Sequence, residues 1–338
     1  MKKYNVCILG ATGAVGQAML LGLEERNFPV ENIRLLASKK SAGKTMKFKD
    51  QEIVIEEATP SSFEGMDIVL GAVENDLSKK FADDIVKAKA VFIDNSSAFR
   101  LDPNVPLVVP EINGEDILKH QGIIANPNCS TIIGCVAVHG IHEVNPIESM
   151  VVSTYQAVSG AGIGGMNEYF DQMKALVSNE PLHPQVFPYQ IASNLIPQIG
   201  SFDENGYTSE EMKMQNEGRR ILHAPDLNVT CTCVRAPVVR SHSLSMNILL
   251  RDEMSVEEIK KLVEKAKGCK LVDDPQNLQY PMPLDTSDQD LVYVGRIRKD
   301  LCQKKAINLW CCGDQIRKGA AINAIQIAEK WIELNERN

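Results

Sequence analysis

The chain has 338 residues, which is longer than one typical domain and predicts two. Acidic side chains outnumber basic ones by 44 to 36, and the net charge of −8 gives no reason to expect nucleic acid or an anionic membrane surface as partner. No run in the sequence approaches the roughly 18 apolar residues of a membrane-spanning helix. With nine cysteines and no recognisable export signal, a disulfide framework is not expected, and the composition indicates the cytoplasm.

The first 125 residues alternate short β-rich runs with amphipathic helical patterns. Parallel strands need long crossovers, which are usually helical, so this alternation predicts an α/β fold with a doubly wound, Rossmann-type parallel sheet. Strands are predicted at residues 6–9, 33–37, 68–73 and 91–94, and helices at 14–26 and 77–89.

The pattern changes after residue 127. We predict a helix at residues 129–143, a flexible glycine-rich segment at 159–165 and a long loop with four prolines at 179–197. The last segment, 317–337, has a broad apolar helical face, so we expect it to pack back on the first domain. The predicted domains are residues 1–127 with the helix at 316–338, and residues 128–315, an α+β domain with a mixed sheet. Its strands are predicted at 150–157, 228–236, 243–250, 291–297 and 306–312.

A glycine-rich turn of sequence GATGAVG follows the first predicted strand and opens the first predicted helix. Glycines allow a tight turn, close approach of backbone N–H groups to a pyrophosphate, and close packing of helix on strand. The helix N-terminus adds a favourable field for the anion. The alternative is a plain glycine-rich β–α turn. The expected cofactor contacts are Gly10, Thr12, Gly13, Ala14, Val15 and Gly16.

The segment after the second predicted strand indicates which dinucleotide binds. NAD enzymes usually place an acidic residue there to bind the ribose 2′-hydroxyl. Residues 37–44, ASKKSAGK, contain no carboxylate, and Ser38, Lys40 and Ser41 suit a 2′-phosphate. We therefore predict NADP, although a solvated surface loop is the alternative interpretation.

Cys129 is the strongest candidate nucleophile. A predicted strand ends before it, Pro127 stiffens the turn, and Cys129 stands at the predicted start of a helix. Helix N-termini and nearby cations lower the pKa of a thiol and increase its reactive thiolate fraction. Most cysteines in such a chain are buried apolar residues, as we expect for Cys135. Position alone therefore leaves both interpretations open.

The other cysteines do not indicate a metal site. The sequence contains no Cys-x-x-Cys pair, and the spacing of Cys231 and Cys233 fits alternation along a strand. Cys311 and Cys312 lack the partners that a zinc site needs. We expect no bound metal.

The sequence of residues 126–131, NPNCST, is similar to the active-site motif of the aspartate-β-semialdehyde dehydrogenase family. The resemblance implies NADP-dependent, reversible conversion of L-4-aspartyl phosphate to L-aspartate 4-semialdehyde and phosphate. It places the chain in lysine (through diaminopimelate), threonine and methionine biosynthesis, and implies a catalytic and dimerisation domain in a homodimer or dimer of dimers. Further similar segments follow in order over nearly the whole chain: residues 10–16, 36–38, 41–44, 94–100, 155–162, 210–214, 235–243 and 317–321.

The resemblance also implies roles for single residues. Cys129 forms a thioester with the substrate, His242 is the general acid and base, and Gln156 orients the substrate beside the thiol. Taken singly, each charged residue is more simply a solvated surface charge, and only the joint pattern favours a site. The implied substrate ligands are Arg235 for the carboxylate, Arg100, Lys213 and Asn128 for the phosphate, and Glu210 or its neighbour Glu211 for the ammonium. Ser159, Gly160 and Gln315 are implied further cofactor contacts.

One position departs from the family pattern, and three other functions stay open. Many relatives carry Arg where this chain has Lys40, so we expect NADP preference to persist in weakened form. N-acetyl-γ-glutamyl-phosphate reductases resemble this family, but Gly-Cys-Tyr is usual there, whereas this chain has Asn128-Cys129-Ser130. A malonyl-CoA reductase is more remote. A non-catalytic dinucleotide-binding homologue is the alternative from another class.

Overall fold

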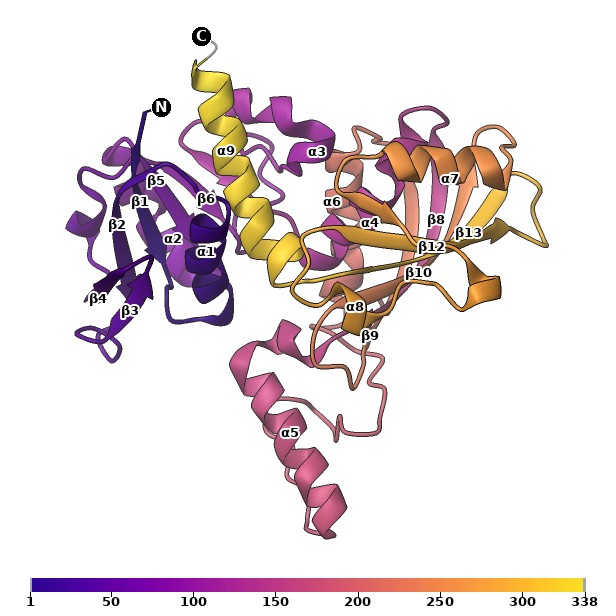
Figure 1. Ribbon diagram of the computed structural model, residues 1–338, viewed down its shortest axis with the longest axis horizontal. Helices are drawn as coiled ribbons and strands as arrows, with labels where there is room; N and C mark the ends of the chain where they lie inside the picture. Colours follow the sequence, from indigo (N-terminus) through magenta and orange to yellow (C-terminus); the bar gives the residue numbers. More distant parts are fainter. Residues whose placement is uncertain (1, 337–338) are drawn as a thin grey trace. The chain divides into compact units, whose positions relative to one another are not determined.

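The computed structural model describes residues 2–336, which form two compact units (Figure 1). The first unit contains the described residues up to Asn128 and those from Ala320 onward. The second unit is Cys129–Gly319. Each unit has its own sheet. In the part of the chain that the structure describes, no helix has the length and apolar character needed to cross a membrane.

The first unit is built on a seven-stranded sheet in the order β3-β4-β2-β1-β5-β6-β7. Neighbouring strands are parallel except β3 and β4, which form an antiparallel pair at the edge. This confirms the predicted Rossmann-type parallel sheet. The strands are β1 (Tyr4–Leu9), β2 (Val30–Ala37), β3 (Thr45–Phe48), β4 (Gln51–Glu57), β5 (Ile68–Gly71), β6 (Val91–Asp94) and β7 (Ile123–Ala125).

Helices cover both faces of this sheet. Successive strand residues point to opposite faces, so the buried strands supply apolar side chains to a core on each side. Ile8 of β1 belongs to the core under α1 (Ala14–Glu25) and α9 (Ile322–Glu336), whereas Leu9 belongs to the core under α2 (Asn75–Lys87). Helix α9 lies beside α1, and a Cβ atom at Gly22 of α1 would come within 2.7 Å of Ile325 Cδ1. The shorter helices are η1 (Pro60–Phe63), α3 (Pro110–Asn113) and η2 (Gly114–Lys119).

The second unit contains a six-stranded mixed sheet in the order β11-β12-β13-β10-β8-β9. The central strand β10 is antiparallel to both neighbours, while β8 and β9 are parallel. The prediction of a mixed sheet is confirmed. The strands are β8 (Ile147–Gln156), β9 (Asn228–Arg235), β10 (His242–Leu250), β11 (Cys269–Leu271), β12 (Val292–Lys299) and β13 (Ala306–Gly313).

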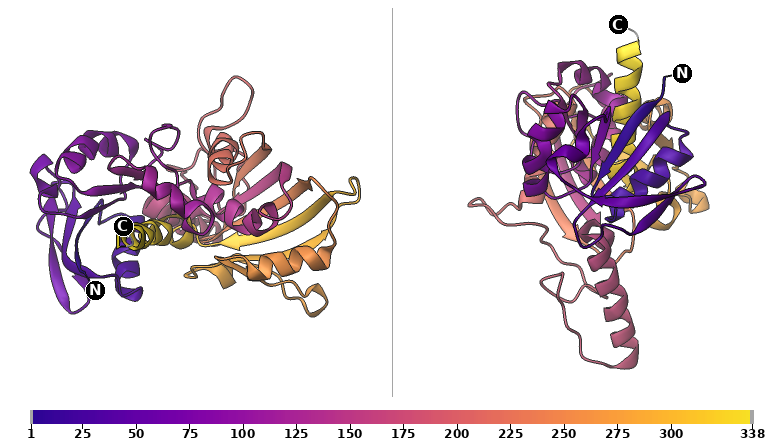
Figure 2. Two further views of the ribbon diagram at one scale, coloured as in Figure 1. Left: turned by 90° about the horizontal axis from the view of Figure 1, so that it is seen from above. Right: turned by 90° about the vertical axis from the view of Figure 1, so that its left-hand side faces the viewer.

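Helices α4 (Cys129–His142), α6 (Ser209–Ile221) and α7 (Val256–Lys265) pack on the sheet of the second unit. Helix α5 (Gly162–Ser178) extends away from that sheet (Figure 2). Its Glu168 accepts a hydrogen bond from the N–H of Gln185 at 2.8 Å, which ties the proline-rich loop to the helix. The shorter helices are η3 (Val158–Ala161), η4 (Pro275–Asn277), α8 (Pro283–Thr286) and η5 (Arg317–Ala321).

One expectation about local structure is corrected, and several elements were not predicted. The segment 159–165 is not an irregular flexible stretch, because η3 and the start of α5 occupy it. The C-terminal helix begins with one π-helical turn, η5, and its predicted end at Arg337 lies outside the described residues. The sequence patterns did not predict the β3–β4 hairpin or helices α5, α6 and α7.

Candidate active site

The glycine turn of the first unit is shaped so that backbone, and not side chains, lines it. Gly10 has φ +92°, and a Cβ atom there would lie 2.3 Å from the carbonyl oxygen of Ala72, which follows β5. A Cβ at Gly16 would lie 2.2 Å from the carbonyl oxygen of Gly10. Gly13 is the N-cap of α1, so Ala14 and Val15 begin the helix and Thr12 lies in the turn. The cradle that a Cβ would fill fits the close approach of a pyrophosphate at the helix N-terminus.

The basic segment after β2 forms an exposed turn in the same unit. The carbonyl oxygen of Ser38 accepts hydrogen bonds from the N–H groups of Ser41 at 2.8 Å and Ala42 at 3.2 Å. Lys39 and Lys40 are exposed. Their ammonium groups are therefore accessible to an anion.

Arg100, also in the first unit, is buried and held by backbone oxygens. Its Nε donates to the carbonyl oxygen of Asn126 at 2.9 Å, and Nη2 donates to that of Asn95 at 2.6 Å. The side chain of Asn126 donates to Asn95 Oδ1 at 2.5 Å and accepts from Asn323 of α9 at 2.6 Å. Asn126 and Asn95 belong to two separate segments that resemble the family, but their role in holding Arg100 in place was not predicted. Asn128, also buried, directly precedes Cys129.

Cys129 is the first residue of α4, as the sequence predicted. Its Sγ lies 3.4 Å from Nε2 of His242. A Cβ atom at Gly319 would come within 2.8 Å of Cys129 Cβ, so glycine leaves space for the cysteine. Cys129 is half-buried, whereas Cys135 in the same helix is buried, and burial raises the pKa of the Cys135 thiol. Of these two cysteines, only Cys129 is both partly exposed to solvent and within reach of an imidazole.

His242 is the first residue of β10 and is fully buried. Its Nδ1 accepts a hydrogen bond from the N–H of Ala157, which follows β8, at 3.1 Å. Burial and, to a smaller extent, the positive charge of Arg235 lower the pKa of His242 to about 3, while the charge of Glu210 opposes the shift. The ring is therefore neutral near pH 7.

Arg235 ends β9 beside Gln156, because the parallel register of β8 and β9 pairs these two residues. Arg235 Nη1 donates to the carbonyl oxygen of Ala157 at 2.8 Å, and the guanidinium lies 5.9 Å from the ring centroid of Phe187. Burial lowers the pKa of Arg235, and the charges of Glu210 and Cys129 oppose this. Gly160 permits the arrangement, because a Cβ there would lie 2.7 Å from Arg235 Nη1.

The two neighbouring carboxylates at the start of α6 have different partners. Glu210 accepts from Gln156 Nε2 at 3.3 Å and forms an ion pair with Lys213 at 2.8 Å. Glu211 closes the capping box of α6 by accepting from the N–H of Thr208 at 2.6 Å, and its other oxygen accepts from the N–H of Cys233 at 2.9 Å. Backbone N–H groups therefore bind both carboxylate oxygens of Glu211, whereas Glu210 lies in a cluster with Gln156.

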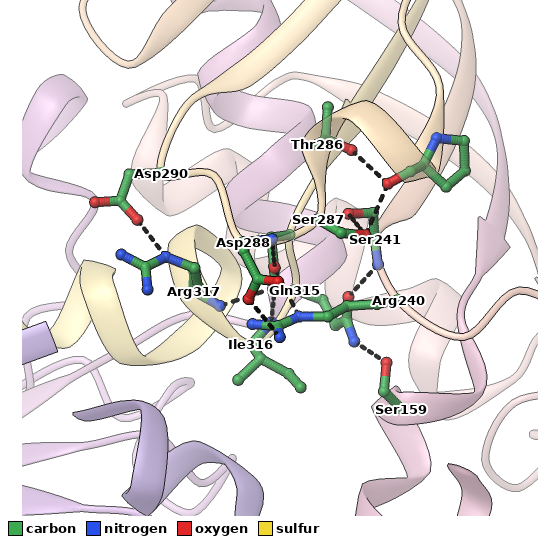
Figure 3. A network of polar contacts seen from close by, with 12 residues as sticks. Ser159, Arg240, Ser241, Thr286, Ser287, Asp288, Asp290, Gln315, Ile316 and Arg317 are labelled. Carbon is green, nitrogen blue, oxygen red and sulfur yellow. Dashed lines mark hydrogen bonds and ion pairs between the residues drawn. The ribbon is translucent and has the colours of Figure 1, made fainter. Parts of the chain in front are cut away.

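Gln315 connects two of the predicted site segments (Figure 3). Its Nε2 donates to Ser159 Oγ, and its Oε1 accepts from the N–H of Ser241 at 2.8 Å. Ser241 directly precedes His242 and has φ +71°, which is unusual for a residue with a side chain.

An ion-pair network that was not predicted lies next to Gln315 (Figure 3). The fully buried Asp314 carboxylate pairs with Arg240 Nε at 2.7 Å and accepts from the N–H groups of Asp288 at 2.7 Å and Ile316 at 2.9 Å. Arg240 also pairs with Asp288 at 2.6 Å. The network joins three segments that are distant in sequence. Of its members, only Arg240, two residues before His242, stood in a segment that the sequence marked as part of the site.

Comparisons with known proteins give similarities along nearly the whole chain. Residues 5–120 match the protein family described as "Semialdehyde dehydrogenase, NAD binding domain". Residues 138–318 match the family described as "Semialdehyde dehydrogenase, dimerisation domain". An aspartate-semialdehyde dehydrogenase of Bacillus subtilis (strain 168) is 49% identical, over 98% of each chain. The crystal structure of aspartate semialdehyde dehydrogenase II of Vibrio cholerae, complexed with ASA, has a TM-score of 0.96 and 41% identity, covering 98% of this chain and 99% of that one.

A more distant structure shares the fold alone. The aspartate semialdehyde dehydrogenase of Candida albicans, solved with NADP, has a TM-score of 0.77 and 24% identity, covering 97% of this chain and 98% of that one.

Proposed function

Because this chain belongs to the aspartate-semialdehyde dehydrogenase family, we propose that it catalyses the NADP-dependent, reversible conversion of L-4-aspartyl phosphate to L-aspartate 4-semialdehyde and phosphate. The observation that carries the proposal is the cluster of Cys129, His242, Gln156 and Arg235 in the second unit. The reaction class fits lysine, threonine and methionine biosynthesis. No disulfide joins any of the nine cysteines, all of which lie among the described residues, and this supports the cytoplasm as the compartment.

We assign cofactor binding to the glycine turn and the basic segment of the first unit. The turn fits a pyrophosphate, and Ser38, Lys40 and Ser41 fit a 2′-phosphate without an opposing carboxylate. Ser159, Gly160 and Gln315 are the proposed contacts from the second unit. When bound, NADPH supplies the hydride that reduces the thioester. A lower KM for NADP than for NAD is expected, and a clear preference for NAD would contradict this assignment.

We assign the covalent chemistry to Cys129. Its thiolate attacks the acyl carbon, the bond to phosphate breaks, and a thioester remains on the sulfur. His242 lies within hydrogen-bonding distance of this sulfur, and the amide of Gln156 is placed by its contact with Glu210. The amide of Gln156 can stabilise negative charge that develops on the substrate oxygen, and His242 serves as general acid and base.

We assign substrate recognition to the charged side chains. Arg235 is the ligand of the α-carboxylate, because a buried guanidinium binds two carboxylate oxygens at once. Glu210 is the ligand of the ammonium, since the backbone already occupies Glu211. A cavity lined by Phe187, Ile196, Gly200 and Arg235, among others, adjoins this proposed carboxylate ligand. The proposed phosphate ligands are Lys213 in the second unit and Arg100 and Asn128 in the first.

We propose that the protein acts as a homodimer. Side chains alternate between the two faces of the sheet of the second unit, and one row on one face is half-exposed. In this row Ser153, Ser245 and Trp310 pair across β8, β10 and β13, and Tyr155 lies two residues beyond Ser153 on β8. Tyr155 and Trp310 stack with centroids 5.6 Å apart. A flat row of partly exposed aromatic and small residues suits an interface between identical chains. Light scattering during gel filtration should give twice the monomer mass, and a monomer would contradict the proposal.

The function is tested by following NADPH formation with purified protein, aspartate semialdehyde, phosphate and NADP. Turnover that requires phosphate is expected. Turnover with only the semialdehyde of N-acetylglutamate would move the chain to the acetylglutamyl enzymes. No turnover by folded, NADP-binding protein would favour a non-catalytic homologue.

A further inference from the structure

Two polar side chains of α5 bind the backbone of the proline-rich loop. The buried carboxylate of Glu168 accepts hydrogen bonds from the three consecutive N–H groups of residues 185–187, at 2.8 Å from Gln185 and at 3.3 Å from Phe187. One turn further along the helix, Oε1 of Gln172 accepts from two later N–H groups of the loop at 2.8 Å and 3.0 Å. A carboxylate that binds several N–H groups holds them strongly, so α5 determines where Phe187 lies.

The ring of Phe187 lies beside the guanidinium of Arg235. Cζ of Arg235 is 5.9 Å from the centroid of this ring, which is within the range in which a cation is attracted to an aromatic face. A Cβ atom at Gly165 of α5 would come within 3.1 Å of Phe187 Cζ, so the glycine leaves space for the ring. The ring is buried in an apolar cluster with Val158 and Ile196. Its position against Arg235 is therefore fixed from the side of the helix.

The same loop also holds the backbone of Arg235. The N–H of Arg235 donates to the carbonyl oxygen of Ile196 at 2.8 Å, and the N–H of Ile196 donates to that of Arg235 at 3.0 Å. At the other end of the side chain, Nη1 donates to the carbonyl oxygen of Ala157 at 2.8 Å. One hydrogen bond and one aromatic ring thus restrict the directions in which the other N–H groups of the guanidinium point.

The restricted guanidinium belongs to the surroundings of the nucleophile. A Cβ atom at Gly160 would lie 2.7 Å from Arg235 Nη1 and 3.3 Å from His242 Cε1, so the two side chains approach the same point. His242 in turn lies 3.4 Å from the sulfur of Cys129. A carboxylate bound by Arg235 would therefore be delivered close to the thiol.

We propose that Phe187 is a positioning residue for Arg235, and that its ring, held in place by Glu168, keeps the guanidinium in the orientation that binds a carboxylate next to Cys129. A guanidinium binds both carboxylate oxygens only when its plane is correctly directed, and a plane fixed in advance lowers the ordering cost of binding. The inference rests on the proposed function for the identity of that carboxylate, which is the α-carboxylate of aspartate semialdehyde.

Alkylation of Cys129 in the absence of substrate tests the orientation of Arg235. Iodoacetate and iodoacetamide both form an S–C bond with the same thiolate and release iodide, but only iodoacetate carries a carboxylate. The ratio of their rate constants, measured at Cys129 by peptide mass mapping, therefore depends little on the thiol pKa. We expect Phe187→Leu to lower this ratio by about 3- to 10-fold toward the value of Arg235→Gln.

Tyr189→Leu is the matched control for the aromatic substitution. Tyr189 lies in the same loop, is 65% exposed, and should keep the wild-type ratio. A wild-type ratio in Phe187→Leu would overturn the proposal. A ratio in the wild type that is no higher than in Arg235→Gln would overturn it as well, because the guanidinium would then not meet a carboxylate at the thiol.

Glu168→Gln tests the same inference with the ring of Phe187 intact. The amide replaces one accepting oxygen by an NH₂ group, which cannot accept from the loop. The ratio should therefore fall by about 2- to 5-fold. Asp171→Asn on the same helix is the control, since this side chain is 75% exposed and should keep the wild-type ratio. A wild-type ratio in Glu168→Gln would show that Glu168 does not hold the ring.

Kinetics with substrate distinguish positioning from a general loss of structure. Phe187→Leu should raise the KM for aspartate semialdehyde by about 10-fold and leave the KM values for NADP and phosphate close to wild type. A lower kcat with an unchanged KM for the semialdehyde would contradict the positioning role. Absence of turnover in the wild type would instead refute the proposed function, and the alkylation ratios would still decide the role of Phe187.

Discussion

The Nε2 atom of His242 lies 3.4 Å from the Sγ atom of Cys129, although 113 residues separate them in the chain. The antiparallel pairing of β8 and β10 places His242 next to the end of β8, where Ala157 holds its ring. The start of α4 places Cys129 against the other ring nitrogen. A thiol, a neutral imidazole and a buried guanidinium thus meet in a single unit of the protein.

Cys129→Ala is expected to lower turnover with aspartate semialdehyde by about 10⁴-fold or more, because the nucleophile is lost. NADP binding, measured by calorimetry, should stay nearly unchanged, since the proposed cofactor contacts lie on other residues. Cys302→Ser is the matched control, because Cys302 is exposed and should tolerate the change without effect. Full activity of Cys129→Ala would disprove the assignment.

Gly160→Ala is expected to reduce kcat/KM by about 100-fold, because the new Cβ would lie 2.7 Å from Arg235 Nη1 and 3.3 Å from His242 Cε1. Either residue must move to make space. Gly164→Ala, only four residues further on, serves as control, because its Cβ would lie 3.5 Å from Val186 Cγ2, an ordinary contact. Equal kinetics for the two variants would show that the clearance at Gly160 is irrelevant to catalysis.

Glu210→Gln and Glu211→Gln should separate binding from stability. Loss of the Glu210 charge is expected to raise the KM for aspartate semialdehyde by about 10- to 100-fold, with little change in thermal stability. Glu211→Gln should leave KM close to wild type but cost about 1 kcal/mol of unfolding free energy, because the charged cap of α6 is weakened. The reverse pattern in kinetics and thermal melting would exchange the two roles.

Asp314→Asn is expected to destabilise the protein by about 3 kcal/mol, because it leaves the Arg240 guanidinium beside a neutral, fully buried partner. Asp288→Asn should cost less than about 1 kcal/mol, since the Asp288 side chain is 71% exposed. Urea denaturation of both variants measures the difference. Equal losses of unfolding free energy in the two variants would show that burial does not strengthen the ion pair of Arg240 with Asp314.

Protonation of His242 links stability to pH. Burial and the charge of Arg235 lower the pKa of His242 to about 3 from 6.5. Between these values the unfolded chain binds one more proton than the folded one, so stability is complete above pH 6.5 and falls as the pH falls toward 3. The wild type should therefore lose up to about 1.4 kcal/mol per pH unit more than His242→Gln. Parallel curves from urea denaturation between about pH 5 and pH 8 would contradict a neutral, buried ring.

The local features of the site could be predicted from sequence because the relevant residues are neighbours in the chain. The turn from Gly10 to Gly16 and the helix start at Cys129 are of this kind. The capping box of Thr208 and Glu211 was equally visible, and it would have predicted α6. The glycines that open α5 misled the interpretation, because the loop is held against this helix by tertiary hydrogen bonds that its N–H groups donate to Glu168 and Gln172.

The contacts that give the site its chemistry depend on strand register, which no local pattern contains. The choice between Glu210 and Glu211 required their partners in space. The hydrogen bond from the N–H of Ala157 to Nδ1 of His242 depends on the pairing of β8 with β10. The ion pair of Arg240 with Asp314 depends on where β13 ends. These relationships require the folded chain.

The central claim is that Cys129 carries the aspartyl group as a thioester, and intact-mass spectrometry tests it most directly. The protein is mixed with aspartate semialdehyde and NADP without phosphate, so that the thioester cannot be released as aspartyl phosphate. We predict one aspartyl group per chain, located by peptide mapping on Cys129, formed together with one NADPH and lost when phosphate is added. Catalytic turnover without this adduct, or an adduct that persists in Cys129→Ala, would contradict the account.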